Sequence, residues 1–329
     1  MNSICHNCSR IRDLVFASSY SLIFTIGFLL NSTALYIFIF RNVVHSITTV
    51  YMKNLAVCDL LLLASMPLRI YYYGWQPQLS PTTCEVAGLL LLVNMYGSIF
   101  LLTCISSDRW MAVRFPLSSW SQAIRRQTKY ICVGIWTLSI GGAIPTYFAG
   151  KNTPKNGTLC FAEYPSENTT RCFDNHPQYV TNVVISSIMV LCYAITLAVV
   201  VTSSFGLLHV FHRSVSAEMK LINISKIRLM VVTNVTIFLG CFLPYHLTLL
   251  CYHVPGLNET HLDQAYRYAL LLSCVNAALD PLVYYFTTET FQRQVPLEPF
   301  LRTRASHSEC VEGVILPGQP LEAQSLPAS

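Results

Sequence analysis

Seven long runs of apolar residues divide the chain, and the stretches between them are shorter and more polar. Each run is long enough to cross the hydrocarbon core of a bilayer as a helix, which takes roughly 20 residues. The runs are far too long and too apolar for the strands of a membrane barrel. The pattern predicts an all-α membrane protein, a bundle of seven transmembrane helices at 14–40, 50–73, 84–113, 130–149, 179–211, 229–252 and 266–286.

The composition agrees with membrane insertion. Of the 329 residues, 53% are hydrophobic and 11% are charged, and the mean hydropathy is +0.47. A soluble domain would carry about 25% charged residues. The first apolar run is too long for a signal-peptide core and lacks a basic start, so we interpret it as a retained first span.

The basic residues of the loops predict the orientation. Lys and Arg follow the odd-numbered spans, with Arg41, Arg114 and Arg213 directly behind them, and this bias marks the cytoplasmic side. The N-terminus is then outside, as expected for a plasma-membrane protein. Glycosylation sequons test this topology independently, because they are modified only in exposed secretory-side segments. Four sequons fall on the predicted outside, at Asn7, Asn156, Asn168 and Asn258.

Polar residues at similar depth in the spans form one candidate site. Asp59 lies in the second span and Asp280 in the seventh, with Asn31 and Ser98 at comparable positions. An ionisable residue in the hydrocarbon core is costly and is a functional hypothesis by default. Two interpretations have equal weight: a hydrated cluster that holds a monovalent cation, or a hydrogen-bonded core with one carboxyl protonated.

Charged residues near span ends are open to more than one interpretation. Arg69 precedes three tyrosines and is either a snorkelling anchor or a pocket cation for an anionic ligand. A guanidinium suits phosphate because it pairs bidentately. Arg267 has the same ambiguity. Asp108 and Arg109 end the third span, where charge alone favours an interfacial anchor pair.

Short motifs, one per span and in order, resemble those of class A (rhodopsin-like) G-protein-coupled receptors. The resemblance covers residues 17–294. The motifs are Gly27 to Asn31, Asn54-Leu-Ala-Val-Cys-Asp59, Cys84, Asp108-Arg109-Trp110, Trp136, Phe238-Leu-Gly-Cys-Phe-Leu-Pro244 and Asp280-Pro-Leu-Val-Tyr284. It implies a receptor with heterotrimeric G proteins and arrestin as partners, no nucleic-acid partner and no enzymatic activity.

The resemblance also assigns roles to residues. Arg109 would engage the G protein when the sixth helix swings outward, and Phe242 would take a toggle position. The other expected participants in coupling and activation are Asp108, Phe238, Pro244 and Tyr284. An allosteric sodium ion would be lined by Asp59, Ser98, Asn276 and Asp280. No other cofactor is expected.

The resemblance divides the chain into an extracellular N-terminus (1–13), the seven-helix domain (14–286), an amphipathic helix (287–295) and a disordered cytoplasmic tail (296–329). The chain also departs from the family pattern. Trp110 stands where the third-helix motif usually has Tyr, and Thr196 and Ser204 replace usual fifth-helix residues. No acidic residue lies near Ile224, so an ionic lock between the third and sixth helices is not expected.

Within class A, the chain is most similar to the lysophosphatidic acid receptors of the purinergic-like cluster. Segments such as Pro67-Leu-Arg-Ile-Tyr-Tyr and Cys241-Phe-Leu-Pro-Tyr carry this resemblance. It implies that Arg69 holds the phosphate of a lysophospholipid. Further pocket candidates are Arg267, Tyr72, Tyr96, His246 and Tyr252.

Other functions remain open at this point. A nucleotide receptor would need more outer cations, and a proton sensor would use outer histidines such as His176 and His253. A transporter or membrane enzyme is the alternative from another class. The chain shows no paired broken helices, no His-Glu-x-x-His set and no nucleophile elbow, which argues against both.

Cysteines complete the sequence evidence. There are 13, and the resemblance implies one bridge from Cys84 to the second outer loop, which offers Cys172 and Cys160. We expect the bridge at Cys172, with Cys160 bonded to Cys5 or Cys8. Cys310 in the tail is a candidate for palmitoylation.

Overall fold

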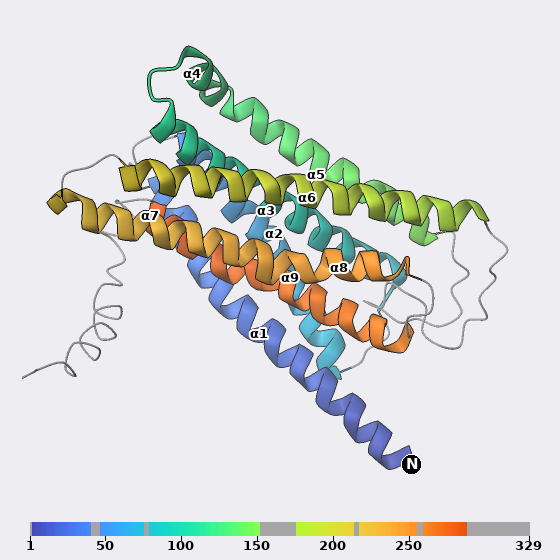
Figure 1. Ribbon diagram of the computed structural model, residues 1–329. Coiled ribbons are helices and arrows are strands. Elements are labelled where there is room, and N and C mark those ends of the chain that lie inside the picture. Colours follow the sequence, from blue (N-terminus) through green and yellow to red (C-terminus); the bar gives the residue numbers. More distant parts are fainter. Residues whose placement is uncertain are drawn as a thin grey trace, which may run out of the picture. The chain divides into compact units, whose positions relative to one another are not determined.

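The computed structural model describes residues 2–40, 47–75, 79–151, 176–213, 217–254 and 259–287 (Figure 1). These residues form helices joined by short turns, and none of them is in a strand. The helices are α1 (Asn2–Phe40), α2 (Ile47–Trp75), α3 (Pro81–Arg114), α4 (Ser119–Arg126), α5 (Thr128–Lys151), α6 (His176–Arg213), α7 (Ala217–Ile237), the π-helical η1 (Phe238–Phe242), α8 (Leu243–Cys251) and α9 (Glu259–Thr287). The predicted all-α fold class is confirmed.

Six segments of the described residues are long and apolar enough to cross a membrane. They are Arg10–Phe40, Ile47–Trp75, Thr82–Arg114, Val183–Val210, Ile227–Cys251 and Gln264–Tyr285. Each overlaps a predicted span. The predicted fourth crossing coincides with α5, which has 24 residues and is not among these six. The helices extend beyond the apolar runs because backbone hydrogen bonding continues where the hydrocarbon ends.

Local signals explain how α3 begins. Ser80 has extended backbone angles, and its hydroxyl accepts a hydrogen bond from the Thr83 N–H at 3.3 Å. Pro81 follows at the first helical position, where its missing N–H leaves no hydrogen bond unmade. These two residues set the start of the helix that packs on α2, α5 and α6.

The sixth crossing is divided into α7, η1 and α8. Pro244 lies in the first turn of α8 and has no N–H to donate. The π turn before it widens the backbone, and the Leu243 N–H bonds to the Phe238 carbonyl. Pro244 and the π turn together interrupt the regular hydrogen bonding of this crossing. Such turns are common at functional sites.

Apolar side chains lie on both the inside and the outside of the bundle. Met52, Leu62 and Met66 are fully buried, whereas Leu191 and Phe205 are 61% and 71% exposed. Outward apolar residues are expected in a bilayer, where lipid tails solvate them. Polar contacts add specific links, such as the hydrogen bond that the Trp136 indole N–H of α5 donates to Asn54 Oδ1 of α2 at 2.9 Å.

The departure at Trp110 has a structural partner on α6. Gly206 faces the Trp110 indole so closely that a Cβ built at Gly206 would overlap the ring. A glycine therefore makes room for the larger aromatic residue. This pairing of α3 with α6 could not be predicted from the motif alone, because the two residues are distant in sequence.

Candidate functional site

We call the end of the bundle that carries Arg69 the outer end and the end that carries Asp108 the inner end, following the orientation that the loop charges predict. Between them lies a layer of buried polar residues, the polar layer: Asn31, Asp59, Asn94, Ser98, Asn276, Asp280 and Tyr284. All seven are between 0% and 2% exposed. The structure thus brings together the four residues predicted to line a sodium site.

Asn94 is a member of the polar layer whose role the sequence analysis did not recognise. Its Nδ2 donates to Asp59 Oδ1 at 3.0 Å and lies 3.5 Å from the Ser98 hydroxyl. The available signal was its spacing, because residues four apart share one face of a helix. Asn31 links its own helix α1 to α9, since its Nδ2 donates to the carbonyl oxygens of Gly27 on α1 at 3.0 Å and Ala277 on α9 at 2.6 Å.

Several buried atoms of the polar layer have no hydrogen-bond partner among the residues that the structure describes. They are Asn31 Oδ1, Asp59 Oδ2, both side-chain atoms of Asn276, both carboxylate oxygens of Asp280 and the Tyr284 hydroxyl. Buried polar atoms are normally bonded, so a group of unpaired ones indicates a place for water or an ion. Carboxylate, amide and hydroxyl oxygens are the donors that hard cations prefer. The residues therefore fit a monovalent cation.

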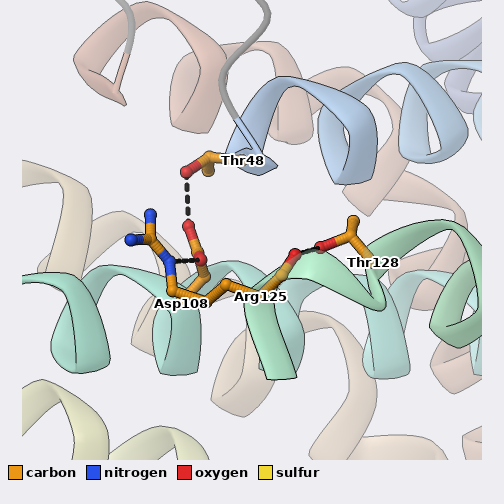
Figure 2. Close-up of polar contacts among 4 residues, drawn as sticks. All are labelled: Thr48, Asp108, Arg125 and Thr128. Atoms are coloured by element: carbon orange, nitrogen blue, oxygen red, sulfur yellow. Dashed lines mark hydrogen bonds and ion pairs between the residues drawn. The ribbon is translucent and has the colours of Figure 1, made fainter. Parts of the chain in front are cut away.

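A second buried carboxylate lies at the inner end. Asp108 is 2% exposed, and its Oδ2 accepts a hydrogen bond from the Thr48 hydroxyl of α2 at 2.6 Å. Its Oδ1 accepts from Arg125 Nε at 2.7 Å (Figure 2). Arg125 belongs to α4, and Thr128 at the start of α5 donates to the Arg125 carbonyl oxygen at 2.6 Å. Asp108 is thus not an interfacial anchor but the centre of a junction of α2, α3 and α4.

Sequence analysis did not predict α4 because eight residues are too few for a span. The sequence also did not indicate Thr48 and Arg125 as partners of the Asp108 carboxylate. Only the folded chain brings these residues together, since Thr48 lies 60 positions before Asp108.

Arg69 lies inside the bundle at the outer end. It is 3% exposed, and its Nη2 donates to the Ala87 carbonyl oxygen of α3 at 3.0 Å. Its guanidinium carbon is 6.0 Å from the centroid of the Tyr20 ring. A snorkelling arginine would extend its guanidinium away from the bundle toward the headgroups. The observed position therefore favours the interpretation of Arg69 as an internal cation.

An aromatic cluster of Phe16, Tyr20, Tyr73 and Tyr268 surrounds this position. Phe16 stacks on Tyr73 with centroids 5.0 Å apart and on Tyr268 at 5.1 Å, and Tyr20 stacks on Tyr73 at 5.8 Å. The cluster links α1, α2 and α9. Of the tyrosines that follow Arg69, Tyr73 is buried in this cluster, whereas Tyr71 is exposed.

The remaining pocket candidates fall into separate groups. The Tyr96 hydroxyl is 3.1 Å from His246 Nε2, and His246 Nδ1 is 2.7 Å from the Phe242 carbonyl oxygen. The Tyr193 ring stacks on His246 with centroids 4.1 Å apart. Tyr252 packs against Tyr266, and Tyr72 packs edge-on against Tyr73. Arg267 is half-buried near Tyr73. The structure thus joins Tyr96 to His246, and it brings Tyr72 and Arg267 close to Tyr73.

A groove between α2 and α3 is a separate feature of the outer half. It is lined by Ala64, Ser65, Leu68, Thr82, Thr83, Val86, Ala87 and Leu90. It shares Ala87 with the hydrogen bond of Arg69. Its lining carries no charged side chain, so it offers no phosphate site by itself.

Other predicted sites lie outside the described residues. Cys84 is disulfide-bonded, as expected. The candidates Cys172 and Cys160 are not described, and neither are Asn156, Asn168 and Asn258, the side chain of Asn7, Cys310, the tail or the helix beyond residue 287. The choice of bridge partner and the modifications stay predictions. Seven cysteines of the helices are free, in line with their expected role as small apolar residues: Cys58, Cys104, Cys132, Cys192, Cys241, Cys251 and Cys274.

Comparison with known proteins identifies the class. The family model of the 7 transmembrane receptor (rhodopsin family) matches residues 30–284. The chain therefore belongs to the rhodopsin family of seven-transmembrane receptors. This confirms the predicted seven-helix receptor fold, and it places the chain among multi-pass membrane receptors that couple to G proteins rather than among enzymes.

The similar receptors include several with a lipid in their names. Human lysophosphatidic acid receptor 6 is 31% identical over 90% of this chain and 87% of its own length. Human lysophosphatidic acid receptor 4 is 29% identical over 86% of this chain and 77% of its own. Human cysteinyl leukotriene receptor 1 is 30% identical over 89% of this chain and 88% of its own. The resemblance to lysophosphatidic acid receptors is thus confirmed at modest identity.

Proposed function

We propose that this receptor binds a lysophospholipid, with lysophosphatidic acid as the first candidate, and activates heterotrimeric G proteins in response. The observation that carries the proposal is the position of Arg69, which is 3% exposed and held inside the outer end of the bundle by the Ala87 carbonyl. A guanidinium removed from water attracts a phosphate strongly and can pair with it bidentately. Similarity to lysophosphatidic acid receptors 4 and 6 supports the same ligand class.

The mechanism follows from where Arg69 sits. Its fixation on α3 and its neighbour Tyr20 on α1 mean that a phosphate bound there would touch several helices at once. A ligand shifts a conformational equilibrium only by as much as it prefers one arrangement of those helices over another. The lipid chain would occupy the apolar outer bundle, and arrestin would be a further cytoplasmic partner. The N-terminus would face the outside of the plasma membrane.

The test is the change Arg69→Ala in cells with a G-protein activation sensor. Losing one charge-assisted phosphate contact, worth about 1.5–3 kcal/mol, predicts at least a tenfold rise in the lysophosphatidic acid concentration for half-maximal response. Arg69→Lys keeps the positive charge but lacks the two parallel N–H donors of the guanidinium, so the rise in the half-maximal concentration should be smaller than for Arg69→Ala. Arg10→Ala on α1 is the matched control, and surface amounts must be equal. An unchanged dose response for Arg69→Ala would overturn the assignment.

A second ligand class has one specific observation in its favour. The human cysteinyl leukotriene receptor 1 is as similar as the lysophosphatidic acid receptors and covers as much of the chain. A leukotriene is also an anionic lipid, so Arg69 would serve it through a carboxylate. A panel of lysophospholipids, cysteinyl leukotrienes, nucleotides and acidified buffer, read with the same sensor, separates these ligands.

We also propose that the polar layer binds a sodium ion that stabilises the resting receptor. Asp59, Ser98, Asn276 and Asp280 would hold it, and the unpaired oxygens of the layer support this assignment. The bound ion would supply positive charge beside two carboxylates that would otherwise repel each other. Asn94 orients Asp59 for this task through its hydrogen bond.

A further inference from the structure

One polar side chain joins the third helix to the sixth crossing within an otherwise apolar part of the inner half. Asn234 on α7 is 2% exposed. Its Nδ2 donates to the Ser106 hydroxyl of α3 and to the Leu102 carbonyl oxygen of α3 at 3.4 Å. The contacted residues lie 128 and 132 positions earlier in the chain. No role was assigned to Asn234 from the sequence, where it only began a sequon expected to be unmodified.

The surroundings make this amide unusual. Leu102, Ile105, Ile237 and Phe238 are each at most 1% exposed. Asn234 Oδ1 has no hydrogen-bond partner among the described residues, so half of this buried amide is unsatisfied. A leucine would fill a similar volume without burying an unpaired oxygen, and it would be the better choice for packing alone. The presence of an asparagine at this position is therefore not explained by stability alone.

The position of Asn234 along the sixth crossing supplies a further reason. It lies four residues before the π turn η1, and Pro244 follows the turn. A π turn and a proline weaken the regular hydrogen bonding of a helix, so the segment below them can tilt relative to the segment above. We call residues 227–237 the inner arm. Asn234 fastens this arm to α3 just below its natural hinge.

The inner arm also packs through an apolar cluster. Met230 and Val231 form a cluster with Leu207 of α6, and Trp110 and Val113 of α3 pack against it. Apolar contacts are non-directional and tolerate sliding, whereas a hydrogen bond is satisfied in one geometry. The two ion pairs found among the described residues, Arg12–Asp13 and Arg125–Asp108, do not involve the inner arm. The amide gives the packed arrangement a defined register.

We propose that Asn234 is a latch that holds the inner arm against α3 in the resting receptor and releases it on activation. It is a positioning residue that acts through the arm and does not touch the ligand. The latch substitutes for the ionic lock that this sequence lacks, and it sits nearer the middle of the membrane. The proposal rests on membership of the receptor family and is independent of the lysophospholipid assignment, because release can be measured without ligand.

The test uses the full receptor reconstituted in lipid nanodiscs with a purified heterotrimeric G protein. Nucleotide exchange is measured without any ligand and normalised to folded receptor. Asn234→Leu removes the latch and should raise exchange about five-fold, the factor that corresponds to one buried hydrogen bond of about 1 kcal/mol. Thr236→Val is the matched control, because it replaces a polar residue on the exposed side of the same helix and should leave exchange unchanged.

Further variants separate a latch from a general packing role. Ser106→Ala removes one of the two acceptors and should raise exchange by less than Asn234→Leu. Adding Ser106→Ala to Asn234→Leu should cause no further rise, because both changes act on one bond. Exchanging the two residues, with Asn234→Ser and Ser106→Asn together, should bring exchange back toward the unaltered level. Exchange equal to or below the unaltered level in Asn234→Leu, or additive effects of the two single changes, would overturn the proposal.

Discussion

Two buried carboxylate sites of the same bundle are satisfied in opposite ways. At the inner end, both oxygens of Asp108 are bonded, one to Thr48 and one to Arg125. In the polar layer, Asn94 bonds to one oxygen of Asp59, whereas the other oxygen of Asp59 and both oxygens of Asp280 have no hydrogen-bond partner among the described residues. A buried charge must be paired, hydrogen-bonded or neutralised. Asp108 is complete within the chain, whereas the polar layer requires a proton, water or an ion from outside.

This contrast separates structure from regulation. The Asp108 junction ties together α2, α3 and α4, so its stability depends only on the chain. The proposed sodium ion of the polar layer would exchange with the solution, so on this proposal the stability of the layer depends on the sodium concentration. The stability contributed by the Asp108 junction should change with mutation, and that contributed by the polar layer should change with sodium. Three experiments test this difference, from the largest expected effect to the smallest.

The largest effect is expected for Arg125→Ala. It leaves the Asp108 carboxylate buried with Thr48 as its remaining partner. Breaking a buried ion pair from one side costs 3–5 kcal/mol, and because Arg125 is 25% exposed we expect about 3 kcal/mol. The thermal unfolding midpoint of purified receptor should fall by several degrees. Adding Asp108→Asn to Arg125→Ala should restore part of the lost stability, because the buried charge is removed. If the double variant loses as much stability as the two single variants added together, the ion pair between these residues is contradicted.

The next effect concerns sodium and the polar layer. For a dissociation constant tenfold below the sodium concentration, binding stabilises the receptor by about 1.4 kcal/mol. The unfolding midpoint should therefore be higher in sodium chloride than in choline chloride at equal ionic strength. Asp280→Asn should abolish the difference, while Arg125→Ala should keep it. Equal midpoints of the unaltered receptor in both salts would refute the sodium site.

The smallest effect is expected for Thr48→Val. This change has a similar shape and removes one hydrogen bond to Asp108, while the ion pair with Arg125 stays. A loss of about 1 kcal/mol is expected, independent of sodium. Thr33→Val is the control, since its hydroxyl bonds only within its own helix at an exposed position. A sodium-dependent loss in Thr48→Val would show that the two carboxylate sites are coupled.

The sequence predicted the polar layer better than the inner end. Asp59 and Asp280 were recognisable because a charge inside an apolar run stands out by itself. Their shared depth followed from counting residues along the spans. The partners of Asp108 were not recognisable, because Thr48 and Arg125 are ordinary polar residues near span ends. The same holds for Asn234, which looked like any polar residue until the fold placed it against Ser106.

The sequence by itself determined that the chain crosses a bilayer as helices, which segments cross and which family the chain belongs to. These properties follow from run length, from loop charge and from short motifs, all of which are local along the chain. Only the tertiary structure decided that Arg69 lies inside the bundle, that Arg125 neutralises Asp108 and that Asn234 fastens the inner arm. Those contacts join residues that are far apart in sequence, and such pairs depend on how helices rotate and pack. Periodicity shows which residues are apolar, but not which polar residue on one helix meets which on another.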